Sequence, residues 1–142
     1  MGTIAVIGLC AFAIVASADA PDYVVEDYAI AAPLSETPGN AERGRAIAVD
    51  RGLGNCLSCH ELPIDAEFFG TTGPTLDGVA RRLSSAQLRL RLVDPKIVNP
   101  MTMMPAYYKT TGLNRVAPAF ASKPILDAQQ IEDVVAFLTT LE

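Results

Sequence analysis

The feature that most constrains this chain is the stretch Cys56-Leu57-Ser58-Cys59-His60. It has the C-x-x-C-H pattern that is typical of covalent attachment of a c-type haem. Two thiols at this spacing can form thioether bonds with the haem vinyl groups, and the adjoining histidine can reach the iron with a neutral imidazole. The pattern therefore predicts that Cys56 and Cys59 tether one haem c and that His60 binds its iron.

Two other interpretations of these cysteines are weaker. A thioredoxin-like C-x-x-C site needs a βαβ context, and no strand-rich pattern surrounds the motif. A structural zinc site needs four ligands, usually cysteine and histidine. The chain has three cysteines and one histidine, and Cys10 lies in a segment that we expect to be removed. Because that single histidine lies inside the motif, haem attachment is also favoured over a chance match.

Residues 1–18 have the pattern of a secretory signal peptide. An apolar run from Ile4 to Val15 is followed by Ala-Ser-Ala at 16–18, and such small residues suit signal peptidase. We expect cleavage after Ala18, although no lysine or arginine precedes the run. The run is too short for a bilayer-spanning helix. The mature protein is therefore predicted to be periplasmic, where thioether haem is attached in bacteria, and to have no membrane segment.

The mature chain divides into an arm and one domain. Residues 19–39 are acidic and contain three prolines, which interrupt any regular helix. They are either a loose solvated leader or an extended arm that lays its apolar side chains on a partner subunit. Residues 40–142 are long enough for a single domain. The formal net charge of −5 and the lack of a basic run argue against nucleic acid as a partner.

Capping signals predict the first and last helices of this domain. Asn40 caps a helix that runs to about Arg51, and small residues such as Gly44 give it a face that another helix can cross closely. Asp127 caps the last helix, with Gln130 as its capping-box partner. That helix carries the clearest apolar stripe of the chain, so we expect it to pack on the first helix.

A middle helix is predicted between Ser84 and Asp94. Ser84 and Gln87 have the spacing of a capping box, and the Asp-Pro pair at 94–95 ends the helix. Its leucines form an apolar face. Arg89 and Arg91 are expected to lie on the opposite, solvated face.

The turn after the haem motif is expected to support His60. This turn reads Gly-Pro-Thr-Leu-Asp-Gly at 73–78, and the proline makes it stiff. A backbone carbonyl near Pro74 is predicted to accept the Nδ1–H of His60, which would fix the ring and raise its basicity.

A second loop holds every methionine except the first: Met101, Met103 and Met104. A haem that carries electrons without binding small molecules needs a sixth iron ligand, and a thioether both supplies one and raises the potential. Met104 precedes a proline, which holds the chain extended there. We predict Met104 as this ligand, with Met103 next in order. Tyr107 and Tyr108 either give a hydroxyl to a haem propionate or simply pack in the protein.

These parts together resemble class I cytochromes c, an all-α fold with three to four helices around one covalently bound haem. Three stretches together resemble the SoxX family, which is the monohaem subunit of SoxAX cytochromes. They are residues 82–91, Asn99–Tyr108 with its Met-Pro-Ala-Tyr-Tyr sequence, and Lys123–Leu126 together with the helix that follows. The combination of the second and third is the most specific part of the resemblance. The resemblance covers residues 40–141.

The resemblance implies a role that spacing cannot show. SoxX pairs with SoxA, whose haem has a cysteine ligand, and the complex oxidatively links thiosulfate to a cysteine of the carrier SoxY. This chain would then be the electron-transfer subunit of an L-cysteine S-thiosulfotransferase and pass electrons to a downstream cytochrome. Cys56 and Cys59 would hold the haem, His60 would be the proximal ligand and Met104 the distal one. No catalytic base or nucleophile is assigned to this chain.

Two alternative functions share much of this chemistry. A freely diffusing cytochrome c would have the same haem ligands and differ in its surface. A haem enzyme or sensor would instead need an open iron site, which Met104 argues against.

Overall fold

The computed structural model describes residues 23–142. The predicted signal peptide, Cys10 and residues 19–22 of the predicted arm lie outside the described residues. Four α-helices occur within 23–142: α1 (Ala41–Val49), α2 (Val79–Arg82), α3 (Ser85–Val93) and α4 (Ala128–Leu138). Single 3₁₀ turns lie at Cys56–Ser58, Pro95–Ile97 and Pro118–Phe120.

The all-α prediction is confirmed. An isolated bridge between Glu26 and Ala29 is the one β pairing in this part of the chain. No helix among the described residues has both the length and the apolar character needed to cross a membrane.

The capping signals identified all three long helices. The side chain of Asn40 accepts a hydrogen bond from the Arg43 N–H at the start of α1. Complete capping boxes join Ser84 to Gln87 and Asp127 to Gln130. The first helix ends two residues earlier than expected, at Val49, because the next residue, Asp50, is extended.

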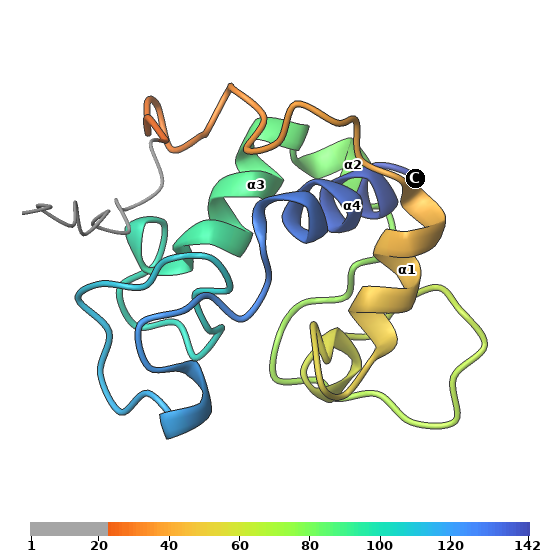
Figure 1. Cartoon of the computed structure of the whole chain (residues 1–142). Helices are drawn as coiled ribbons and strands as arrows, with labels where there is room; N and C mark the ends of the chain where they lie inside the picture. Colours follow the sequence, from red (N-terminus) through yellow and green to blue (C-terminus); the bar gives the residue numbers. More distant parts are fainter. Residues whose placement is uncertain (1–22) are drawn as a thin grey trace, which may run out of the picture.

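Helices α1 and α4 cross at close range beside the C-terminus (Figure 1). A Cβ atom on Gly44 would collide with the backbone oxygen of Asp133 and approach the Cβ of Phe137. A Cβ on Gly39 would collide in the same way with the backbone of Glu132. The glycines therefore set the separation of the two helices, which confirms the close crossing predicted for the first helix.

Residues 23–39 pack on their own chain. They run across α3 and α4 before entering α1 (Figure 1). Ile30 is fully buried with Leu90 and Val93 of α3, and its N–H donates to the carbonyl oxygen of Ala86 at 3.0 Å. The N–H of Leu34 donates to Glu132 of α4 at 2.9 Å. This part of the arm is thus anchored at its centre, while Val24 and Tyr28 remain largely exposed.

The expectation of a solvated Arg89 was wrong. The residue is buried, and its guanidinium donates to both carboxylate oxygens of Glu132, at 2.7 and 2.9 Å. A third bond, at 2.6 Å, goes to the carbonyl oxygen of Ile30. Arg91 is half-buried and donates to the Gln87 carbonyl of its own helix. Arg89 is buried because α4 supplies the countercharge and the arm supplies a further acceptor.

Candidate haem site

Two loops are central to the site. The attachment loop (residues 50–60) follows α1, and the methionine loop (residues 98–108) follows α3. Both extend from the same side of the helices (Figure 1). The main core contains Leu62 and Tyr107, and Cys56, Leu57 and Met104 pack against it. The predicted attachment and distal residues therefore border one apolar cluster.

Local hydrogen bonds wind the C-x-x-C-H motif into a tight turn. Asn55 has a left-handed backbone, with φ of 48°, and starts the 3₁₀ turn at Cys56–Ser58. The N–H groups of Cys59 and His60 both donate to the Cys56 carbonyl oxygen, at 3.1 and 2.9 Å. This turn therefore holds Cys56, Cys59 and His60 in one compact segment.

Both thiols of the motif are free and half-buried. Burial, with a smaller contribution from the nearby Cys59, raises the pKa of Cys56 to about 11. The Cys56 sulfur is therefore protonated at neutral pH, and its reactivity as a nucleophile is low before haem attachment.

His60 is oriented by the turn that follows the motif. Its Nδ1 lies 2.7 Å from the carbonyl oxygen of Pro74. A carbonyl can only accept, so Nδ1 carries the proton and Nε2 keeps a free lone pair for a metal. The predicted acceptor for His60 is thereby confirmed.

Gly73 makes room for the imidazole. A Cβ at this position would collide with Cε1 of His60. The Gly73 N–H also donates to the Cys59 carbonyl at 2.8 Å, and the Leu76 N–H donates to the Glu61 carbonyl at 2.8 Å. The turn is therefore tied along the motif, and a glycine is required where it meets the ring.

The three methionines differ in exposure. Met101 and Met103 are 87% and 84% exposed, whereas Met104 is half-buried against the main core. The Met104 N–H donates to Oγ1 of Thr102 at 3.2 Å. The arrangement favours Met104 over its two neighbours, and its role as the distal ligand stays a prediction.

Sequence reasoning did not find the partner of Tyr107. Its hydroxyl donates to the carbonyl oxygen of Gly54 at 2.6 Å, so the proton is already engaged within the protein. The two residues are 53 positions apart, and no local pattern pairs them. The left-handed Asn55 next to Gly54 marks a fixed turn but gives no indication of its partner.

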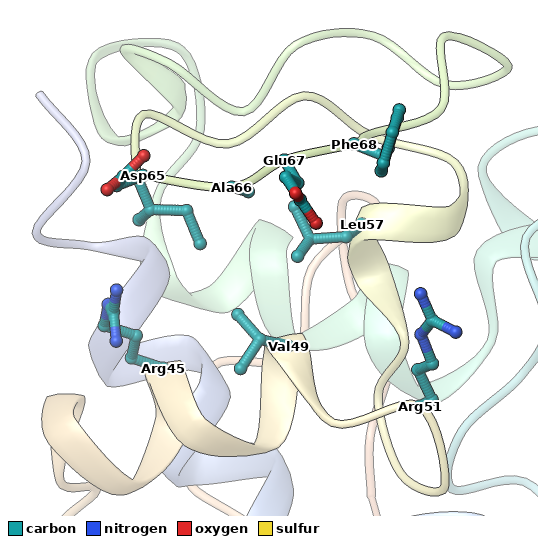
Figure 2. Close-up of a pocket in the computed structure, with 9 residues that line it drawn as sticks. Arg45, Val49, Arg51, Leu57, Asp65, Ala66, Glu67 and Phe68 are labelled. Atoms are coloured by element: carbon teal, nitrogen blue, oxygen red, sulfur yellow. The ribbon is translucent and has the colours of Figure 1, made fainter.

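A hollow of about 300 Å³ lies between α1 and the segment 64–68. Figure 2 shows Arg45, Val49 and Arg51 on one side and Asp65 and Glu67 on the other. Leu57 is the one motif residue that lines it, and neither thiol nor His60 does. This hollow is therefore separate from the ligand set.

Comparisons with known proteins agree with this geometry. A family model for cytochrome c matches residues 41–142. A chain in the crystal structure of SoxXA from P. pantotrophus is 44% identical, with a TM-score of 0.79. The match covers 87% of this chain and 97% of that chain. The chain belongs to the cytochrome c family, and within it to the SoxX cytochromes. A comparison with curated proteins gives no match.

The residues of this SoxX chain fit the haem c of its family. The two free thiols have the spacing for thioether bonds, and the hydrogen bond to Pro74 leaves Nε2 of His60 available. Gly73 leaves room for the imidazole ring, and the half-buried thioether of Met104 would supply a second ligand to the same iron. The cofactor is a covalent haem c, as predicted, and the class I fold is confirmed.

When bound, the haem supplies a one-electron iron couple. The protein contributes orientation and basicity: the Pro74 carbonyl polarises the imidazole of His60 through Nδ1–H. Cys56 and Met104 pack against the main buried core, so apolar residues border one side of the site. Both effects tune the potential at which an electron is held.

Proposed function

We propose that this SoxX chain is the electron-transfer subunit of a periplasmic SoxAX complex, with His60 and Met104 as its two iron ligands. The match along nearly the whole length of a chain from SoxXA carries the proposal. The orientation of His60 by Pro74 and the inward position of Met104 support the ligand pair.

The complex is proposed to act as an L-cysteine S-thiosulfotransferase on a SoxY-type carrier. Joining the carrier thiol to thiosulfate forms a sulfur–sulfur bond and releases one proton and two electrons. Those electrons require an acceptor outside the reacting sulfurs, and the proposed role of this chain is to pass them to a downstream cytochrome. The sulfur chemistry is assigned to the SoxA-like partner.

Native purification from the periplasm tests this function. We expect the chain to co-elute with a second, larger haem protein, and thiosulfate plus a SoxY-type carrier to reduce the haems of that complex. Thiosulfate with a carrier whose cysteine is replaced by serine is the matched control and should leave the haems oxidised. A lone monohaem monomer that stays monomeric at high dilution would instead identify a freely diffusing electron carrier.

A further inference from the structure

Tyr107 connects the two loops of the haem site. Its side chain is 7% exposed, and its hydroxyl donates to the Gly54 carbonyl at 2.6 Å. Gly54 lies two residues before Cys56, and Tyr107 lies three residues after Met104. A single buried hydrogen bond therefore joins the chain beside the first attachment thiol to the chain beside the predicted distal ligand.

The backbone of Tyr107 is held on two further elements. Its N–H donates to the Leu92 carbonyl of α3 at 2.9 Å. Its own carbonyl oxygen accepts from the N–H groups of Ile125 and Leu126, at 2.8 and 2.9 Å. The ring therefore projects from a point fixed both to α3 and to the segment that leads into α4.

Gly54 is fixed equally well on the other side. Its N–H donates to the Ile47 carbonyl of α1 at 3.1 Å, and a Cβ on Gly54 would lie 2.7 Å from that oxygen. The next residue, Asn55, has the left-handed backbone that starts the attachment turn. These contacts fix the orientation of the Gly54 carbonyl group, and its oxygen accepts the hydrogen bond from the Tyr107 hydroxyl.

We propose that Tyr107 is a positioning residue that holds the methionine loop at its ligating distance from the attachment loop through the bond to Gly54. This inference rests on the proposed ligation by Met104. Loss of the hydroxyl would leave a buried carbonyl without its partner and allow the two loops to separate. Burial raises the pKa of Tyr107, so the hydroxyl keeps its proton throughout the physiological range.

The test compares haem-loaded mature proteins that carry Tyr107→Phe or Tyr108→Phe. Tyr108 is the neighbouring, half-buried tyrosine, and no hydrogen bond of its hydroxyl is found among residues 23–142. Carbon monoxide competes with methionine for the reduced iron, so its affinity measures how firmly the thioether is held. We expect Tyr107→Phe to raise that affinity about tenfold, the equivalent of one buried hydrogen bond. Tyr108→Phe should leave it unchanged.

Two further variants separate positioning from general stability. Ser84→Ala removes the cap of α3, away from both loops, and should lower stability without changing the affinity for carbon monoxide. Gly54→Ala displaces the carbonyl itself and should raise the affinity. Its effect and that of Tyr107→Phe should be less than additive in the double variant. Where Tyr107→Phe does not fold, Gly54→Ala carries the test.

Equal affinities for carbon monoxide in Tyr107→Phe and Tyr108→Phe would overturn the inference. So would an effect of Ser84→Ala as large as that of Tyr107→Phe. A failure of the underlying ligation has a different signature. In that case wild type itself binds carbon monoxide without competition, and Met104→Ala changes nothing.

Discussion

The Nδ1 of His60 and the carbonyl oxygen of Pro74 are 2.7 Å apart, and the intervening turn passes so close to the ring that residue 73 must be glycine. This contact fixes both the tautomer and the plane of the imidazole. The strength of the proposed iron–histidine bond therefore depends on a residue that has no side chain.

Replacing Gly73 with alanine should weaken the hold of His60 on the iron. The new Cβ collides with the ring, which must rotate away from the Pro74 carbonyl. Loss of such a supporting contact typically costs a metal site about 10- to 100-fold in affinity. In an acid titration followed by haem absorbance, the pH at which the imidazole leaves the iron should rise by about one to two units.

The matched control is Gly52→Ala in the attachment loop. A Cβ there meets only a carboxylate oxygen of Asp50, at 3.2 Å. This variant should titrate like wild type. An equal shift in the two variants would contradict a specific role for Gly73.

Met104→Ala should lower the reduction potential and open the iron to external ligands. A thioether stabilises reduced iron, and axial ligands together span roughly 0.8 V of potential. The measurements are a potentiometric titration and the spectrum of the reduced protein under carbon monoxide. Met101→Ala and Met103→Ala are the controls, since both side chains are largely exposed. A normal potential in Met104→Ala with a lowered one in Met103→Ala would transfer the ligand role to Met103.

Breaking the pair between Arg89 and Glu132 should cost more stability than a surface charge does. Glu132→Leu leaves the buried guanidinium without its bidentate partner, and such a loss typically costs about 3–5 kcal/mol. The double variant Arg89→Met/Glu132→Leu should recover much of this, because no unpaired charge remains. Chemical denaturation followed by circular dichroism gives both values.

The same pair should control the N-terminal segment. Arg89 holds the Ile30 carbonyl, and Glu132 holds the Leu34 N–H. Limited proteolysis between residues 23 and 39 should therefore be faster in Glu132→Leu than in wild type. Arg91→Ala is the control, because Arg91 bonds only to its own helix among the described residues. Equal cleavage rates in all three proteins would mean that the segment is held by other contacts.

The range of each interaction decided what the sequence could reveal. The caps at Asn40, Ser84 and Asp127 act on backbone groups three residues away, so composition and spacing were enough. The acceptor for His60 was predictable because a ligating imidazole needs one and a stiff Gly-Pro turn follows it.

Arg89 and Tyr107 were beyond that range. Their partners lie 43 and 53 residues away on other elements. A charged or phenolic side chain in a helix or loop gives no local indication of such a partner, so Arg89 was expected in solvent. Only the crossing of the helices and the arrangement of the two loops bring each pair together.

The carboxylate of Asp133 should make the protein sensitive to acid. Burial alone would raise its pKa, but hydrogen bonds from Arg43, the Asn40 N–H and Gln129 outweigh burial, so the native pKa lies below the ordinary 3.8. The native state therefore favours the ionised form. The resulting stability is present above pH 3.8 and is lost as the pH falls through the lower native value.

Asp133→Asn tests this linkage directly. At neutral pH the variant should be less stable by about 1–3 kcal/mol, the typical loss when buried hydrogen-bond partners are disturbed. The difference from wild type should shrink as the pH falls below 3.8, because wild type then loses the same charge. Denaturation midpoints measured from pH 7 to pH 2 give the comparison, with the exposed Glu36→Gln as control. If the stability difference between wild type and Asp133→Asn stays constant over this range, then the contribution of Asp133 does not depend on its ionisation.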